Sequence, residues 1–258
     1  MTLHALKHCS RLAFGQVGRV HSVFARACNL AMANGELWVL QTRGMPLAPN
    51  GIIVDVDDLR HCFRAGMSVA CLLHGGDVVM SVSKPVSTQL VPEGDEASFR
   101  SFASALSAFL VEQPYSGFRL ALRQEPALTE IYQRFTHWLA GGADDVVVLL
   151  RFLIGRGEGL TPSGDDFLAG VMLVAENWRH PRLDLLRESL PPLLSATTDI
   201  SREMLAHACC GRYSQHLLSL VTSSPADFYA VANYGHTSGL DMLAGMAAVS
   251  GSHLSRLS

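Results

Sequence analysis

Two adjacent carboxylates, Asp165 and Asp166, stand at the start of an apolar helical pattern in the middle of the chain. They follow a glycine-rich turn in the segment GRGEGLTPSGDDFLAG, residues 155–170. A serine before a helix can cap it, and an acidic residue three positions later can reach back to the cap. Free N–H groups beside glycine at a helix start also bind anions. The segment therefore predicts either a capped, buried helix or a polar binding site.

The same pattern occurs a second time near the end of the sequence. GLTPSGDDFLAG, residues 159–170, aligns with GHTSGLDMLAG, residues 235–245, when Pro162 is omitted. The matched pairs are Thr161 and Thr237, Ser163 and Ser238, Gly164 and Gly239, Asp166 and Asp241, Leu168 and Leu243, and Gly170 and Gly245. We interpret the two segments as an internal repeat of a helix-start motif.

Each copy has the residues of a capping box. Ser163 with Asp166, and Ser238 with Asp241, are expected to cap their helices, which stabilises a protein by about 1 kcal/mol per cap. A glycine inside a helix costs about 1 kcal/mol relative to alanine. Gly170 and Gly245 therefore predict that the two helices cross closely, near a pseudo-twofold axis that brings their N-termini together.

Asp165 and His236 are the candidate catalytic residues. Asp165 has no counterpart in the second copy, where Leu240 stands; it is expected to point outward as a metal ligand, substrate contact, proton acceptor or solvated carboxylate. His236 can donate to an anion or transfer a proton, or it is a turn residue bonded to the backbone. A third hydroxyl-rich helix start, residues 197–201, can join the same pocket. The candidate substrate-binding residues are Asn29, Thr161, Ser163, Gly164, Asp166, Thr198, Ser201, Thr237, Ser238, Gly239 and Asp241.

The elements that must position these residues divide the chain in two. Residues 20–32, 36–42 and 51–56 are typical of strands, and Asn34-Gly35 between the first two is a strong hairpin signal. Gly75-Gly76 predicts a second hairpin in the same way. Asn29, a polar residue in an apolar strand, is either a ligand contact or a turn former. We expect a domain over residues 1–92 that is an antiparallel sheet or small barrel.

After Pro92 the apolar positions recur three and four residues apart, as amphipathic helices require. An all-α bundle is expected over residues 93–258, so the predicted fold class is α+β. The helical segments are 96–113, 127–140, 144–155, 165–178, 183–196, 200–210, 214–221, 226–234 and 240–250.

Composition excludes several classes of function. The chain has 258 residues, a net charge of −3 and no run of Lys or Arg, which argues against nucleic-acid binding. It is 48% hydrophobic and 17% charged, which favours a homo-oligomer or a subunit of a complex. The longest apolar run, residues 146–150, is too short to cross a membrane, and no signal-peptide core is present, so we expect a cytoplasmic protein. Six cysteines without CxxC spacing and histidines without HExxH argue against a zinc site.

The motifs resemble those of the AllH (YlbF)-like family of oxamate carbamoyltransferase subunits, which act in anaerobic allantoin degradation. The likeness is carried by Gly155, Gly157, residues 159–170, residues 235–245 and the residues Thr197, Thr198, Ile200 and Ser201, and it extends to strand residues around 21–24 and 29–30. It implies phosphorolysis of oxalurate to oxamate and carbamoyl phosphate, with other subunits as partners and small anions as substrates. The Ser-Thr-Arg-Thr-Arg signature of ordinary transcarbamoylases is absent.

Two other functions stay open at this point. One is a metal-assisted hydrolase or lyase in which Asp165, Asp166 and Asp241 bind Mg²⁺ or a similar divalent ion. The other is a non-catalytic scaffold subunit in which the motifs are only helix caps. The sequence fixes no cofactor, and tight divalent binding or stable partner proteins would separate these functions.

Overall fold

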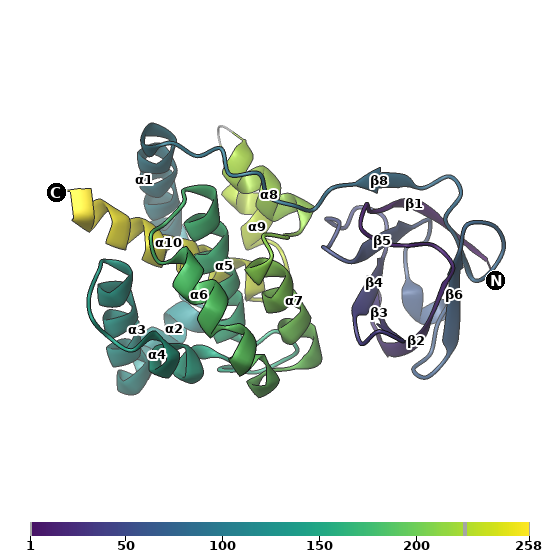
Figure 1. The fold of residues 1–258 in the computed structure, drawn as a ribbon, viewed down its shortest axis with the longest axis horizontal. Coiled ribbons are helices and arrows are strands. Elements are labelled where there is room, and N and C mark those ends of the chain that lie inside the picture. Colours follow the sequence, from purple (N-terminus) through teal and green to yellow (C-terminus); the bar gives the residue numbers. More distant parts are fainter. Residues whose placement is uncertain (1, 224–225, 258) are drawn as a thin grey trace. The chain divides into compact units, whose positions relative to one another are not determined.

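The computed structural model describes residues 2–223 and 226–257, and these form two compact units. One unit contains the chain up to Gln89 together with Tyr213–His216, and the other contains Leu90–Arg212 and the chain from Leu217 onward. Strands make up the first unit and helices the second, as Figure 1 shows. The α+β class is therefore confirmed.

Eight strands and a short 3-10 helix occur in the described part of the first unit. They are β1 (Leu3–Cys9), β2 (Gln16–Val23), β3 (Ala27–Met32), β4 (Leu37–Gln41), β5 (Gly51–Val54), η1 (Leu59–His61), β6 (Ser68–Leu72), β7 (Val78–Val79) and β8 (Lys84–Val86). The strand order is β5-β4-β3-β2-β6-β7-β1-β8, and the additional pairing of β1 with β5 closes seven of them into a barrel. Alternating side chains such as Leu3, Ala5, Leu30 and Leu40 fill its core.

The sheet is mixed rather than antiparallel. The Asn34-Gly35 hairpin is confirmed, because β3 and β4 pair antiparallel on either side of it. The Gly75-Gly76 hairpin is wrong, since β6 and β7 pair in parallel. The Asp77 carboxylate accepts the Ala70 N–H at 2.8 Å, so this backbone donor is bonded to a side chain rather than to a backbone carbonyl of β7.

Two further strand expectations need correction. The run 20–32 is two strands, β2 and β3, because the chain turns where the Phe24 N–H donates to the Ala27 carbonyl at 2.7 Å. Strand β1 was not expected at all, although it pairs with β5, β7 and β8. Its basic residues hide the alternation that places Leu3 and Ala5 in the core.

The described part of the second unit contains ten α-helices and one 3-10 helix. They are α1 (Glu96–Glu112), α2 (Gly117–Gln124), α3 (Pro126–Leu139), α4 (Val146–Leu153), α5 (Ser163–Asn177), α6 (Leu183–Ser189), η2 (Pro191–Ala196), α7 (Asp199–Cys209), α8 (Gln215–Thr222), α9 (Phe228–Ala232) and α10 (Ser238–Leu257). The sequence did not predict α2, a short helix with a single buried residue, Phe118.

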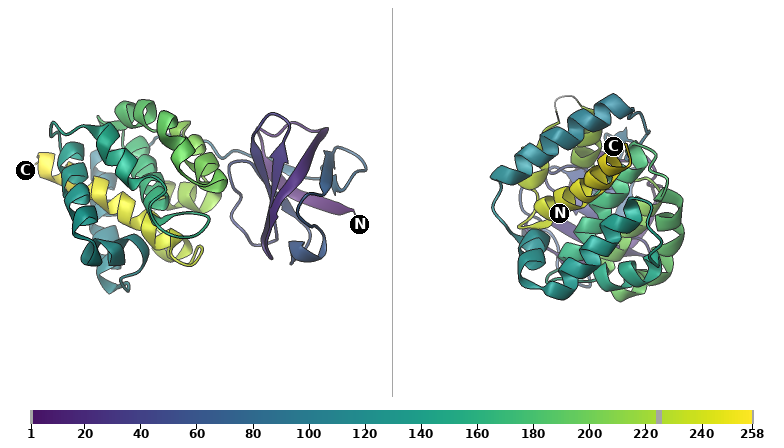
Figure 2. Two further views of the ribbon diagram at one scale, coloured as in Figure 1. Left: turned by 90° about the horizontal axis from the view of Figure 1, so that it is seen from below. Right: turned by 90° about the vertical axis from the view of Figure 1, so that its left-hand side faces the viewer.

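Helix α5 is the central helix of this unit. Every residue from Gly164 to Asn177 is buried, and the stretch 167–175 within it is apolar on all faces. Its most extensive contact is with α10, which lies among the other helices and is coloured yellow in Figure 2. The two motif copies therefore begin the two helices that pack together most closely.

Candidate functional site

Helices α5 and α10 touch backbone to backbone at their glycines. A Cβ atom on Gly170 would collide with the carbonyl oxygen of Met242, and one on Gly245 would collide with that of Phe167. Phe167 and Met242 occupy equivalent places in the two motif copies. The expected close crossing at these glycines is therefore present, and its contacts are reciprocal.

The turns that lead into the two helices are built alike. The Gly164 N–H donates to the Arg156 carbonyl at 2.8 Å, and the Gly239 N–H donates to the Tyr234 carbonyl at 3.0 Å. A Cβ on Gly164 would strike the last carbonyl of α4, and one on Gly239 would strike a carbonyl of α9. In each case glycine lets the helix start press against the helix before it. The duplication itself stays a prediction.

The two helix starts meet directly. The hydroxyl oxygens of Thr161 and Ser238 lie 2.9 Å apart, so one start hydrogen-bonds the other. Across this junction the hydroxyls of Ser238 and Thr161 lower the pKa of Asp166, and those of Ser163 and Thr237 lower the pKa of Asp241. Each carboxylate thus lies near one hydroxyl from its own helix start and one hydroxyl from the other helix start.

The predicted capping boxes are wrong. The N-cap of α5 is Pro162, which makes no side-chain cap hydrogen bond, and the helix begins at Ser163. Asp166 therefore lies one position too far along to reach the cap, and its side chain is buried instead. Asp241 serves a different helix, since its Oδ1 accepts the Phe118 N–H of the first turn of α2 at 2.6 Å.

Asp165 does not point outward. Its side chain is fully buried, its Oδ1 accepts the Gly155 N–H at 2.8 Å, and its Oδ2 accepts the Thr197 hydroxyl. This carboxylate therefore joins the glycine-rich turn to the segment before α7. The third helix start forms as expected, with Thr198 as N-cap accepting the Ser201 N–H at 3.1 Å.

Burial dominates the electrostatics of the three aspartates. It raises the pKa of Asp165 and of Asp241, although hydrogen bonds oppose the shift in both. Burial raises the pKa of Asp166 to about 8, and the charge of Asp241 adds to that rise against the hydroxyl of Ser238. Burial therefore opposes the ionised form of the Asp166 carboxyl.

Three carboxylate oxygens at the junction have no hydrogen-bond donor. They are both oxygens of Asp166 and the Oδ2 of Asp241, and both side chains are fully buried. The hydroxyls of Ser238 and Thr161 lie near Asp166. Buried carboxylate oxygens are usually paired, so these three are unusual in the interior of a protein.

The backbone amides of the first turns are largely occupied. In α5 the amides of Gly164, Asp165 and Asp166 all donate to carbonyl oxygens within the protein, and in α10 those of Gly239 and Asp241 do the same. An anion at this junction would therefore rely on side-chain hydroxyls more than on free helix amides. The hydroxyls of Thr161, Ser163, Thr237 and Ser238 belong to residues that are partly exposed.

The remaining sequence candidates lie in different surroundings. His236 is exposed in the turn before α10. Asn29 belongs to the strand unit, where its side-chain amide donates to the Ser22 hydroxyl at 2.9 Å. Asn29 therefore belongs to a different unit from the helix starts.

Three residues at the junction were missed from the sequence. Gly117, with a φ of +49°, lies against the Asp241 carboxylate, and Phe118 bonds it. Tyr234 is also close, because burial and the charge of Asp166 raise the pKa of its hydroxyl. The Ser-Gly pair at 116–117 before an amphipathic segment was the available signal for the first two.

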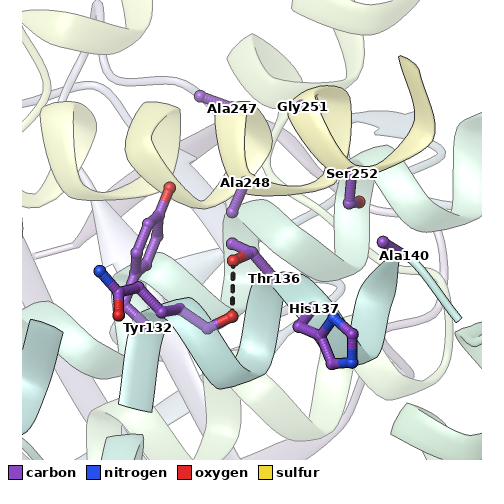
Figure 3. Close-up of a pocket in the computed structure, with 9 residues that line it drawn as sticks. Tyr132, Thr136, His137, Ala140, Ala247, Ala248, Gly251 and Ser252 are labelled. Atoms are coloured by element: carbon purple, nitrogen blue, oxygen red, sulfur yellow. Dashed lines mark hydrogen bonds between the residues drawn. The ribbon is translucent and has the colours of Figure 1, made fainter. Parts of the chain in front are cut away.

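A hollow lies elsewhere in the helical unit. Figure 3 shows Tyr132, Thr136 and His137 of α3 beside Ala248 and Ser252 of α10. Ala248 is ten residues beyond Ser238, which is roughly 15 Å along a helix. The hollow is therefore separate from the helix starts.

The structure can be compared with two further possibilities, a metal site made of three carboxylates and a membrane-spanning helix. Within the described residues, no group of three or more His, Cys, Asp or Glu side chains is arranged to hold a metal ion. Asp165, Asp166 and Asp241 therefore do not form the three-carboxylate metal site that a hydrolase or lyase was expected to use. Among the described helices, none has the length and apolar character needed to cross a membrane.

Comparison with known protein families gives two matches. Residues 153–250 match the model of the oxamate carbamoyltransferase subunit AllH. Residues 2–86 match the model of the AllH family N-terminal domain. No solved structure matches the chain. The first match covers α5, α7 and most of α10, and so includes all three helix starts.

Proposed function

Because the chain belongs to the AllH family of oxamate carbamoyltransferase subunits, we propose that it supplies the substrate site of such an enzyme. The proposed site is the junction of the starts of α5, α7 and α10. The observation that carries the proposal is the 2.9 Å contact between the hydroxyls of Thr161 and Ser238. It joins the two motif copies into one polar, partly exposed surface.

The proposed reaction is the phosphorolysis of oxalurate. A phosphate oxygen forms a bond to the ureido carbonyl carbon, and the bond from that carbon to the oxamate nitrogen breaks. The nitrogen takes a proton, so the products are carbamoyl phosphate and oxamate. Two anions must be held together and the developing charge on the carbonyl oxygen stabilised, which fixed hydrogen-bond donors do.

The partly exposed hydroxyls are the proposed donors to these anions. Thr161 and Ser163 come from the α5 start, and Thr237 and Ser238 come from the α10 start. The Thr198 hydroxyl of the α7 start already donates to the Leu160 carbonyl at 2.5 Å, so we assign Thr198 the positioning of the α7 start beside the α5 turn. His236, exposed beside them in the turn, is the proposed donor of the proton to the leaving nitrogen. A histidine suits that role because imidazole changes charge near neutral pH.

The buried members of the motif have a different proposed role. Asp165 uses both carboxylate oxygens to hold Gly155 and Thr197, so we assign it the positioning of the glycine-rich turn rather than contact with substrate. Gly164 and Gly239 shape the starts, since their amides are already bonded. Ser201 is buried as well and supports the α7 start.

The chain is proposed to act with partner subunits in the cytoplasm. Its family is one of subunits, which implies a hetero-complex. The sequence lacks the arginine-rich signature with which ordinary transcarbamoylases bind carbamoyl phosphate. Partner subunits are therefore expected to provide part of the positive charge that phosphate requires.

Titration of the chain with inorganic phosphate by calorimetry tests the site. We expect Thr161→Ala and Ser238→Ala to weaken phosphate binding roughly 10- to 100-fold each, the effect of one hydrogen bond to a charged group. Thr136→Ala is the matched control, because its hydroxyl bonds the Gln133 carbonyl at 2.9 Å and lines the separate hollow. Binding that is lost in the control and kept in the other two variants would move the site to that hollow.

A further inference from the structure

The three donorless oxygens of Asp166 and Asp241 are unexplained by the anion site. Both side chains are completely buried, and neither oxygen of Asp166 has a hydrogen-bond donor. Oδ1 of Asp241 has the Phe118 N–H as its donor, whereas its Oδ2 has none. A buried carboxylate oxygen without a hydrogen-bond donor or a cation costs much free energy. We therefore expect a bound group beside these oxygens.

The polar groups named around these carboxylates all present oxygen atoms. The hydroxyls of Thr161 and Ser238 reach Asp166, and those of Ser163 and Thr237 reach Asp241. Carboxylate and hydroxyl oxygens are ligands that hard cations accept, and soft metal ions prefer nitrogen or sulfur. These hydroxyl residues are themselves partly exposed.

Charge also favours a cation at this place. The hydroxyls of Ser238 and Thr161 and the carboxylates of Asp241 and Asp165 act on Asp166, and the Tyr234 hydroxyl lies close to it. The Phe118 N–H in the first turn of α2 partly compensates the negative charge of Asp241. Asp166 lies in the first turn of its own helix, α5, and has no such contact with the start of α2. Two buried carboxylates near each other ionise together only when a positive charge joins them.

We propose that Asp166 and Asp241, with the hydroxyls of the two helix starts, bind one hard divalent cation such as Mg²⁺. The site differs from a three-aspartate site, because both oxygens of Asp165 are engaged by Gly155 and Thr197. Mg²⁺ commonly uses one or two carboxylates and completes its shell with water and substrate oxygens. Two carboxylates and neighbouring hydroxyls therefore suffice.

The cation gives the proposed reaction a positive charge that the helix starts lack. Phosphate and oxalurate are anions, and they would otherwise approach two buried carboxylates. A cation between those carboxylates and the substrates removes that repulsion and can polarise a carbonyl or phosphoryl oxygen. This use of the cation rests on the proposed function, whereas its binding does not.

The test measures metal binding in the absence of substrate. The chain is freed of metal with a chelator and titrated with Mg²⁺ by calorimetry and with Mn²⁺ by electron paramagnetic resonance. We expect one ion per chain, and at least a tenfold loss of affinity in Asp166→Asn and in Asp241→Asn. Asp199→Asn, which changes an exposed aspartate at the first residue of α7, is the matched control and keeps full affinity.

Thermal unfolding separates loss of the site from loss of the fold. Asp166 has no donor to lose, so Asp166→Asn folds in chelator at least as well as the unchanged chain. Mg²⁺ should raise the Tm of the unchanged chain and of Asp199→Asn, and leave that of Asp166→Asn in place. Should Mg²⁺, Mn²⁺ and Ca²⁺ neither bind nor shift Tm, the carboxylates hold a proton instead and the proposal is overturned. Phosphate binding that persists in chelator would still leave the substrate site standing.

Discussion

Asp165 and Asp166 are neighbours in the sequence, yet their carboxylates have different neighbours in the fold. Successive residues on a helix point about 100° apart. Asp165 therefore faces Gly155 and Thr197, and Asp166 faces Ser238 on α10. The two adjacent carboxylates therefore have different roles. Asp165 organises the glycine-rich turn, and Asp166 faces α10.

Removal of Asp165 should destabilise the protein. In Asp165→Ala the part-buried Gly155 N–H and Thr197 hydroxyl lose their acceptor, and an unsatisfied donor in such a place costs about 1 to 3 kcal/mol. We expect urea denaturation to show a fall of that size in the free energy of unfolding. Asp199→Ala, which removes an exposed ion pair with Arg202, should change it by less than about 1 kcal/mol. Equal stability of the two variants would contradict the positioning role.

The types of residue at the site could be read from the sequence, but not all of their contacts. Local pattern identified Thr161, Ser238 and the aspartates, because hydroxyls, glycines and carboxylates recur at one spacing. The bond from Phe118 to Asp241 spans 123 positions along the chain, and nothing local to either residue signals it. The direction of a carboxylate depends on such distant neighbours.

At the scale of elements, the crossing of α5 and α10 decides where the helix starts lie. Gly170 and Gly245 carry the sequence information for it, since interior glycines are unfavourable unless a close approach offsets their cost. The capping prediction failed for a related reason. Pro162 moves the start of α5 to Ser163, and Asp166 then lies on the buried side of the helix.

Alanine at either crossing glycine should separate the two helices. A Cβ on Gly170 or on Gly245 meets a backbone carbonyl that cannot move aside, so each substitution should cost about 1 to 3 kcal/mol or more. Gly251→Ala is the control within α10, because a Cβ there meets nothing within 4 Å. It should stabilise the helix by about 0.5 to 1 kcal/mol. Tm values measured for the three variants check this, and a destabilised control with stable crossing variants would refute the close approach.

Helices were easier to predict than strand pairing, for a physical reason. A helix is stabilised by contacts three and four residues apart, so its pattern is visible in a short window. The direction of β7 depends on β6 and β1, which lie on either side of it in the sheet. The Gly75-Gly76 turn was compatible with a hairpin, but pairing with β1 placed β7 parallel to both neighbours.

At the scale of the whole molecule, the chain is expected to be a subunit rather than a complete enzyme. Its mean hydropathy is +0.22 and only 17% of its residues are charged. The described part exposes large apolar side chains, among them Val111 at 81% and Tyr229 at 59%. A partner subunit is expected to cover such surface.

Turnover of oxalurate by the assembled complex tests the central claim most directly. The complex is reconstituted with the unchanged chain, with Ser238→Ala or with Thr136→Ala, and carbamoyl phosphate formation is followed at saturating and limiting phosphate. We predict that the chain alone has little activity and that the complex is active. We further predict that Ser238→Ala lowers kcat/KM roughly 10- to 100-fold without disturbing assembly, the cost of one hydrogen bond to a charged group, while Thr136→Ala has no effect. A complex that assembles with Ser238→Ala and turns over at the full rate would contradict a substrate site at the joined helix starts.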